Sequence, residues 1–354
     1  MGRGILPVAG VHSSARSSSF LYLSMSSLPA QQQGLMSYSN HSSPSSFILT
    51  GIPGLEDAQF WIAFPFCTVY FIAVLGNITL LLVIRIDPSL HLPMFYFLSM
   101  LAAIDLVLTT STMPKLLSIF WFHSHEINFE GCVAQMFFIH SFSMVESGVL
   151  LTMAFDRYLA ICKPLRYSTI LTGPTIAKLG LTAAVRGIAI ATPATCMVAN
   201  LSYCGPRVIH HSYCEHMSVV KLACGDTRPN SIYGITVATV VVGSDSILIA
   251  VSYMLILREV VGLSSREARL KSFGTCGSHI GVILLFYMPG LFSFYTQRWG
   301  RSIPVHVHIL MADLYLLVPP MLNPLIYGMR TKAIRERVLS LLWQKGNKPS
   351  PSLM

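Results

Sequence analysis

The sequence predicts an all-α membrane protein in which seven transmembrane helices form a bundle, and three observations lead to this fold class. Of the 354 residues, 53% are hydrophobic and 11% are charged, whereas a soluble domain has about 25% charged residues. Seven apolar runs each reach the roughly 20 residues that a helix needs to cross a bilayer. Lysine and arginine are also distributed unevenly over the loops between these runs. This composition excludes an ordinary soluble fold.

The seven spans are expected, in chain order, at residues 60–84, 94–116, 132–161, 175–198, 231–257, 273–295 and 305–328. Spans 3 and 5 exceed the minimum length, which indicates tilt or extension past the bilayer. Span 7 is the weakest by hydropathy, because His306, His308, Asp313 and two prolines interrupt it. After it, residues 331–343 are expected to form an amphipathic helix along the membrane surface. The apolar face of this helix would carry Ile334, Val338, Leu339 and Leu342.

The positions of lysine and arginine predict the orientation of the chain. One set of loops and ends carries fifteen of them and the opposite set eight, with Arg186 inside span 4. Because basic residues concentrate on the cytoplasmic side, the C-terminus is expected inside and the N-terminus outside. Residues 1–50 are expected to be a disordered extracellular N-terminus, 51–330 the transmembrane domain and 331–354 a cytoplasmic tail with the amphipathic helix. Asn40 begins an N-glycosylation sequon on the predicted outside.

Four of the eight cysteines fall on the predicted outside: Cys132 at the start of span 3, and Cys204, Cys214 and Cys224 in the loop between spans 4 and 5. An oxidising exterior favours disulfides among them. A bond from span 3 to the loop would hold the loop over the bundle. The sequence alone leaves all three pairings of the four cysteines open.

Acidic residues inside the spans need partners, because a charge within a bilayer is costly. Asp105 in span 2 and Glu146 in span 3 are candidates to share a buried cation or a proton. A bound sodium ion is one hypothesis, and a hydrogen-bonded network with water is the other. Asn323 in span 7 is a further buried polar candidate. Asp245 in span 5 is expected to bond to a neighbouring serine or to span 6.

The predicted cytoplasmic end of span 3 carries an adjacent acid–base pair, Asp156 and Arg157. An exposed charge pair at a helix end would contribute under about 1 kcal/mol, and the residues alone do not exclude that reading. Pro289 in span 6 and Pro324 in span 7 remove backbone donors, so that either span can kink and pivot.

Several segments, in order and without large gaps over about residues 45–342, resemble the olfactory receptors, a branch of the rhodopsin-like G-protein-coupled receptors. These segments are HLPMFYFLSMLAAIDL (91–106), MAFDRYLAIC (153–162), KSFGTCGSH (271–279) and PPMLNPLIYGMRTKAIRERV (319–338). Two further segments, GIPGLE (51–56) and SYCEHM (212–217), resemble the class I, or fish-like, subgroup and its subfamilies 51, 52 and 56.

The resemblance implies an odorant receptor that activates a stimulatory, olfactory-type G protein and raises cAMP. In such receptors the Asp–Arg pair stabilises the resting cytoplasmic face until span 6 moves outward. The switch residues carried over are Asp156, Arg157, Tyr158, Asn323, Pro324 and Tyr327. The family pattern also pairs Cys132 with Cys214 and Cys204 with Cys224, with Cys132–Cys224 as the alternative.

A ligand cavity is expected in the outer half of the bundle, beneath the loop between spans 4 and 5. The resemblance implies that Arg298, at the outer end of span 6, binds a carboxylic acid together with His140, while the apolar walls take an alkyl tail. The predicted ligand-binding residues are His140, Ser143, Met144, Ser147, Met217, Ser293, Phe294, Gln297 and Arg298. The alternatives are that Arg298 is a solvated loop residue and that His140 is a helix histidine with internal partners.

Other function classes fit the sequence less well. It contains no HExxH, nucleophile-elbow or phosphate-loop motif, so no enzyme is expected. A transporter would show repeated halves with broken helices, and the seven spans are dissimilar. Within the receptor class, a metabolite sensor outside the nose is the alternative. The expected partners are a small odorant, the G protein and membrane lipid, with no nucleic acid, and the expected location is the plasma membrane of olfactory cilia.

Overall fold

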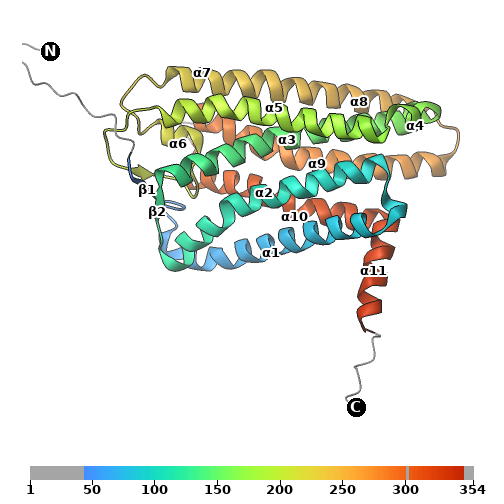
Figure 1. Cartoon of the computed structure of the whole chain (residues 1–354), viewed down its shortest axis with the longest axis horizontal. Coiled ribbons are helices and arrows are strands. Elements are labelled where there is room, and N and C mark those ends of the chain that lie inside the picture. The colour runs from blue at the N-terminus through green and yellow to red at the C-terminus, as the bar shows by residue number, and fades with distance from the viewer. Residues whose placement is uncertain (1–43, 300–302, 347–354) are drawn as a thin grey trace, which may run out of the picture. The chain divides into compact units, whose positions relative to one another are not determined.

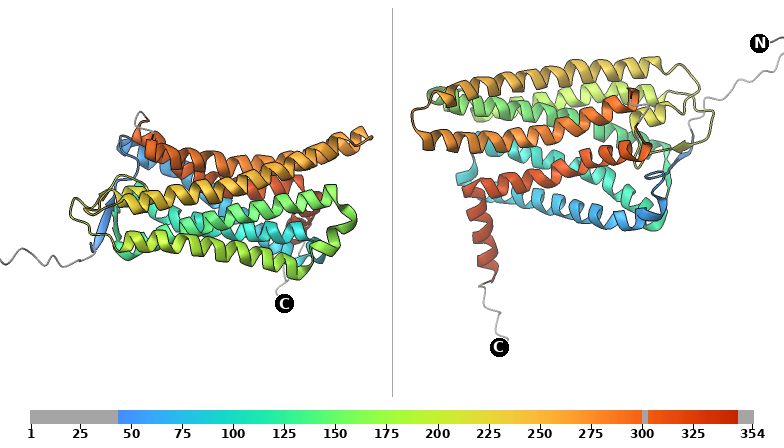
Figure 2. Two further views of the ribbon diagram at one scale, coloured as in Figure 1. Left: turned by 90° about the horizontal axis from the view of Figure 1, so that it is seen from above. Right: turned by 180° about the vertical axis from the view of Figure 1, so that it is seen from behind.

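The computed structural model describes residues 44–299 and 303–346. The Asn40 sequon and most of the predicted N-terminal segment therefore lie outside the described residues. Figures 1 and 2 show long helices that run side by side to form a bundle.

Seven helical spans in the described ranges are long and apolar enough to cross a membrane, which confirms the predicted fold class. They are α1 (Glu56–Ile86), α2 (Pro93–Phe122), α3 (Phe129–Cys162), α5 (Gly173–Ala199), the run of α7 (Arg228–Val237), η3 (Ala238–Val242) and α8 (Gly243–Val261), α9 (Arg266–Trp299) and α10 (Val305–Arg330). Each covers its predicted range and extends beyond it. The expectation that span 7 is the least hydropathic is wrong, because its mean hydropathy of 1.6 exceeds the 1.4 of α3 and α5.

Short elements connect the spans. They are η1 (Pro88–Leu90), η2 (Pro164–Arg166), α4 (Tyr167–Ile170) and α6 (His216–Val220). Local sequence explains several helix ends. Pro93 begins α2, where its missing N–H is not needed. Asn128 caps α3 by accepting a hydrogen bond from the Gly131 backbone N–H at 2.9 Å. His123 ends α2 in the left-handed region with φ 51°.

The outward faces of the helices carry large apolar side chains. On α1, Trp61, Phe71 and Leu75 are more than half exposed. Such a continuous apolar surface would be unstable in water and matches the hydrocarbon of a bilayer.

A small sheet corrects the prediction that residues 1–50 are disordered. Strand β1 (Ser46–Leu49) pairs antiparallel with β2 (Glu126–Asn128) and parallel with β3 (Val208–Ile209), in the order β2–β1–β3. Phe47 and Leu49 on β1 are buried, and Ile48 between them is exposed. The prediction is wrong for residues 46–49, because this alternation buries two side chains against the bundle.

Two disulfides lie beside the sheet, Cys132–Cys214 and Cys204–Cys224. This is the pairing that the resemblance implies. The first attaches the start of α3 to the segment that leads into α6. The end of the bundle that holds the sheet and both disulfides is called the sheet end below, and the opposite end, where α11 (Lys332–Gly346) begins, is called the tail end (Figure 1).

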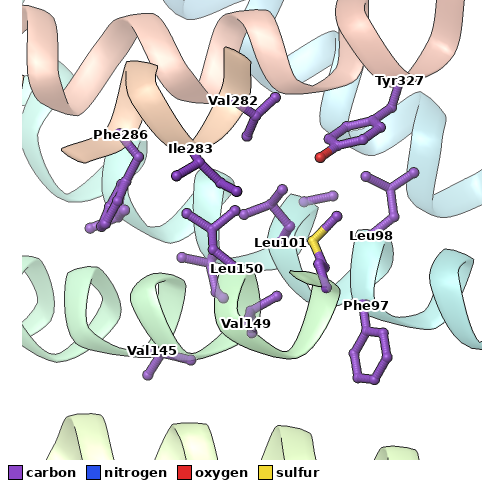
Figure 3. Close-up of a cluster of buried hydrophobic side chains, with 14 of the residues drawn as sticks. Phe97, Leu98, Leu101, Val145, Val149, Leu150, Val282, Ile283, Phe286 and Tyr327 are labelled. Carbon is purple, nitrogen blue, oxygen red and sulfur yellow. The ribbon is translucent and has the colours of Figure 1, made fainter. Parts of the chain in front are cut away.

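The largest core cluster forms where α2, α3, α9 and α10 meet. Figure 3 shows Leu98 and Leu101 of α2, Leu150 of α3, Val282 of α9 and Tyr327 of α10 in this cluster. All five side chains are at most 5% exposed. This core joins the sheet end to the tail end, so a shift of α9 must disturb its packing against α3 and α10.

Helix α11 occupies the place predicted for the amphipathic helix. It starts at the tail end and projects past α1 beyond the bundle (Figures 1 and 2). Ile334 is buried against the main core, and Val338 packs partly against it. Leu339 is exposed, so it points away from the bundle. The side chain of Leu342 lies outside the described residues. Arg337 pairs with Asp87 at 3.3 Å, which links α11 to the connection between α1 and α2.

Candidate functional site

A cavity of about 190 Å³ lies between α3, α5, α7, α9 and α10, beneath the Tyr213–His216 segment. Six of the nine predicted ligand-binding residues line it: His140, Ser143, Met144, Ser293, Phe294 and Arg298. The walls are mostly apolar. The cavity is called the inner cavity below.

The other three predicted residues lie elsewhere. Ser147 is one turn deeper on α3, where its hydroxyl is engaged by other side chains. Met217 packs against a second core cluster, which contains Phe47 and Leu49 of strand β1. Gln297 lines a neighbouring cavity. The helical period places Ser147 on the same face of α3 as His140, but the period does not show how deep along the helix the cavity ends.

Arg298 lies on α9, which continues to Trp299. The alternative of a solvated loop residue is therefore wrong. Its guanidinium lies 3.9 Å from the centre of the Phe294 ring, and its Nη1 donates to the Phe294 carbonyl at 3.3 Å. Its Nη2 is so close to α7 that a Cβ on Gly234 would lie 2.6 Å away. Its Nε is buried without a partner among the described residues. Arg298 thus keeps donor capacity for a ligand.

Glu215 and His216 are cavity residues that the sequence reasoning missed. Glu215 caps α6 and accepts from the Ser218 backbone N–H at 2.6 Å. Burial opposes its charge, but His211, His216 and backbone N–H groups outweigh it and lower the pKa of Glu215 to about 2. Glu215 is therefore ionised and attracts Arg298. A signal was present, since both residues directly follow Cys214, which the family pattern attaches to α3.

His140 of α3 lies against His216, with ring centroids 5.7 Å apart in an edge-to-face arrangement. The helix and the loop thus place two imidazoles in the inner cavity wall. Either ring can exchange hydrogen bonds with a polar ligand group.

A buried polar network lies next to the cavity floor and gives Asp245 a partner that the sequence did not suggest. Arg186 of α5 donates to Asp245 Oδ1 from Nη1 at 2.8 Å and to Oδ2 from Nη2 at 2.7 Å. Ser147 donates to the same Oδ2 at 2.6 Å and also bonds Tyr287 of α9 at 2.8 Å. The expected serine partners instead bond backbone carbonyls. Four spans, α3, α5, α8 and α9, are thus joined at one level.

Close contact between α3 and α5 makes this network possible. A Cβ on Gly187 would lie 2.6 Å from the Ser141 carbonyl oxygen. A Cβ on Gly148 would lie 2.9 Å from the Cβ of Ala183 and 3.0 Å from Nη2 of Arg186. These two glycines therefore let α5 pass near enough for Arg186 to reach past α3 to α8. Nearby, η3 interrupts the α-helical span as a π-helix and contributes Ala238 and Val242 to the cavity wall.

Comparison with known proteins places the chain in a family. Residues 66–345 match the olfactory receptor family. Human olfactory receptor 52R1 is 57% identical over 305 residues, which cover 86% of this chain and 97% of that protein. Human olfactory receptor 52K2 is 56% identical over 302 residues, 85% of this chain and 96% of that protein. Human olfactory receptor 51E1 is 51% identical over 302 residues, 85% and 95% respectively.

The chain belongs to the olfactory receptor family. Members of this family are receptors, so this olfactory receptor is a multi-pass membrane protein and not an enzyme.

At the tail end of the receptor, Asp156 and Arg157 form a buried pair rather than an exposed one. Asp156 is fully buried and Arg157 is 18% exposed. Arg157 donates to Asp156 Oδ2 from both Nε and Nη2, and Tyr167 of α4 donates to Oδ1 at 2.8 Å. Tyr158 packs with Ile256 and the rest of a small cluster between α3, α8 and α9. The alternative of an ordinary exposed pair is therefore wrong.

The polar residues at mid-bundle lie close together. Asn323 donates from Nδ2 to both carboxylate oxygens of Asp105, at 3.2 and 3.0 Å. Glu146 is near enough for its charge to interact with that of Asp105. Among the described residues, Oε1 of Glu146 and the Oδ1 atoms of Asn77 and Asn323 are buried acceptors without a partner. No group of three or more His, Cys, Asp or Glu in that part of the chain could hold a metal ion.

The other two predicted switch residues lie on α10. Pro324 touches α1, where a Cβ on Gly76 would lie 2.8 Å from its ring. Tyr327 is buried beside His279 of α9, with ring centroids 6.4 Å apart. The six predicted switch residues thus lie on α3 and α10, with Asp156 and Arg157 at the tail end and Asn323 at mid-bundle.

Acidification is expected to destabilise the sheet end of the receptor. Burial lowers the pKa of His211 and of His216 to about 4, against about 6.5 in an unfolded chain. As the pH falls through 6.5, the unfolded state binds protons first, so the free energy of unfolding decreases by about 1–2 kcal/mol per histidine at pH 5. Thermal unfolding of the purified receptor at pH 7.5 and pH 5 measures this loss.

The double variant His211→Asn, His216→Asn is the control for this experiment. It should lose much less stability between the two pH values. An equal loss in both proteins would contradict the assignment to these histidines.

Proposed function

We propose that this olfactory receptor detects a small carboxylic acid in the inner cavity and responds by activating a stimulatory, olfactory-type G protein that raises cAMP. The observation that supports the ligand class is Arg298, a guanidinium with free donor capacity in the wall of a mostly apolar cavity. Carboxylates suit the planar donor geometry of arginine.

The cavity supports the alkyl part of such a ligand. Met144, Val237, Leu291 and other apolar side chains line it. Each buried CH₂ contributes about 0.8 kcal/mol, and about 190 Å³ holds a short or medium chain. Affinity should therefore rise with chain length until the cavity is full.

Glu215 weakens this attraction, because its carboxylate lies in the same cavity and interacts with Arg298. A ligand carboxylate would be attracted to Arg298 but repelled by the Glu215 carboxylate. Binding is therefore expected to be weak, and Glu215→Gln should make carboxylic acids more potent. The direction of the change in potency distinguishes the two ligand classes, because a cationic ligand would become less potent in the same variant.

Replacing Arg298 tests the ligand class. Arg298→Ala should reduce the potency of straight-chain acids by about 30- to 150-fold, since it removes a charge-assisted hydrogen-bonded pair worth about 2–3 kcal/mol. Arg298→Lys should retain part of the response. Concentration–response curves for acids and for alcohols of equal length, read as cAMP in cells, provide the measurement.

Surface expression of each variant is the control for that experiment. Unchanged acid responses in an Arg298→Ala receptor that reaches the surface would exclude the carboxylate hypothesis.

We also propose that the sheet end faces outward and the tail end faces the cytoplasm, in the plasma membrane of olfactory cilia. The fifteen basic residues on the tail-end loops and ends, against eight on the opposite side, support this orientation. Two disulfides at the sheet end suit an oxidising compartment. Exposed basic residues near the tail end, among them Arg258 and Arg266, suit contact with the G protein and with anionic lipid. Antibody access to epitope tags at either terminus of intact cells tests the orientation.

Sodium binding at mid-bundle is a further part of the proposal. Buried acceptor oxygens of Asn77, Glu146 and Asn323 lack partners among the described residues, and Asp105 adds a carboxylate. Oxygen atoms are the ligands that hard cations prefer.

Replacing sodium with a larger cation should change agonist affinity in the native receptor, and Glu146→Ala should abolish this dependence. Radioligand or functional competition curves in sodium and in N-methyl-glucamine buffers provide the measurement. Native affinity that is the same in both buffers would rule out the ion.

A further inference from the structure

A second cavity of about 540 Å³ lies at the sheet end, beside the inner cavity. It is called the outer cavity below. The β3 region and α6 form one side, and the ends of α9 and α10 form the other. Arg298 lines both cavities and is therefore the wall that they share. The outer cavity goes beyond the proposed function, which needs only the inner one.

The lining of the outer cavity is electropositive. Lys221 and Arg298 supply two cations, and His210, His211 and His308 supply imidazoles. No aspartate or glutamate of the described residues lines it. Glu215, whose charge acts on His211 and His308, lines the inner cavity instead.

Polar atoms of the lining are buried and unsatisfied. Among the described residues, no hydrogen-bond partner is present for Nε2 of His211, Oε1 of Gln297, Nε of Arg298 or Nε2 of His308. His211 is only 1% exposed. Buried polar atoms are normally hydrogen-bonded, so this lining suits a polar occupant, water or ligand, better than an apolar one.

Local hydrogen bonds show which of these atoms can donate. The Tyr213 backbone N–H points at Nδ1 of His211 at 3.4 Å, so Nδ1 is the acceptor and Nε2 carries the proton. Thr296 donates to the Phe292 carbonyl at 2.7 Å and accepts from Nδ1 of His308 at 2.8 Å. His211, Arg298 and Lys221 therefore present N–H donors, which suit an anion.

We infer that the outer cavity is a second binding site, for a small organic carboxylate held between Lys221, His211 and Arg298. A ligand at this site would contact the same guanidinium that faces the inner cavity. Carboxylates would therefore be concentrated next to the inner cavity.

Binding of trifluoroacetate to the full-length receptor in lipid nanodiscs tests this inference by ¹⁹F line broadening at low chloride concentration. Lys221→Gln removes an exposed cation and should weaken binding about fivefold. Ala194→Phe, which fills the inner cavity from α5, should remove only the broadening that arises in the inner cavity and leave the part that depends on Lys221. Lys178→Gln, an exposed lysine near the tail end, is the matched control and should also have no effect.

Three results would overturn the inference. The first is loss of binding in Ala194→Phe with none in Lys221→Gln, which would place the anion in the inner cavity alone. The second is equal weakening by Lys221→Gln and Lys178→Gln, which would indicate general charge attraction. The third is complete displacement by equimolar chloride, which would indicate a site for inorganic anions. These three results concern binding and not activation. Failure of the proposed function would instead be seen in the cAMP responses to acids.

Discussion

Asp245→Leu is expected to remove most of the receptor from the cell surface. Asp245 is 2% exposed and accepts hydrogen bonds from Arg186 and Ser147. Its loss leaves the Arg186 guanidinium uncompensated inside the bundle, which costs about 3–5 kcal/mol. Most proteins have only about 5–15 kcal/mol of total stability. Flow cytometry of an N-terminal tag and thermal unfolding of the purified variant measure the effect.

A second substitution shows whether the buried charge is the cause. The double variant Arg186→Met, Asp245→Leu removes both charges and should recover much of the expression, because an apolar pair can replace a buried ion pair. Ser147→Ala should cost far less, since it leaves the ion pair in place. A double variant that is no better than Asp245→Leu would show that the network stabilises the fold in some other way.

Asp156→Asn is expected to raise basal cAMP about tenfold. The buried Asp156 accepts from Arg157 and from Tyr167, and these bonds favour the arrangement seen here. Loss of the charge should weaken them by about 1.4 kcal/mol, which changes a two-state equilibrium tenfold. Agonist-free cAMP, normalised to surface receptor, gives the measurement.

Tyr167→Phe is the matched control for Asp156→Asn, because it removes one neutral hydrogen bond and keeps the ion pair. Its basal cAMP should rise about two- to fivefold, less than in Asp156→Asn. If basal signalling of Asp156→Asn equalled that of the native receptor at equal expression, the pair would not stabilise the resting state.

The spans were predictable because each is a long apolar run, and a bilayer leaves the helix as the fold for such a run. Strand β1 was not predicted from the sequence. Its four residues carry only a weak alternation, and their partners lie about 80 and 160 positions further along the chain. Pairing at that separation is a tertiary property. The π-helix at η3 likewise has no sequence signal of its own.

The site was predictable where polar residues recur along one face of an apolar helix, as from His140 to Ser147, or where the family resemblance carries it, as for Arg298. The Arg186–Asp245 pair was missed because its members lie on different spans, 59 positions apart. Glu215 was missed because a loop residue has no periodicity to give its direction. The disulfide between Cys214 and Cys132 holds the residue next to Glu215 against α3. The position of Glu215 therefore follows only once that disulfide is known.

The most direct test of ligand-driven activation is a distance between spin labels at residues 166 and 266, on η2 and at the start of α9, with the free cysteines Cys67, Cys162, Cys196 and Cys276 replaced. An acid agonist at a concentration that just saturates the native receptor should lengthen this distance by several ångströms in the native background and by much less in Arg298→Ala. A native distance that stays constant while the acid demonstrably binds would contradict coupling between the inner cavity and the tail end.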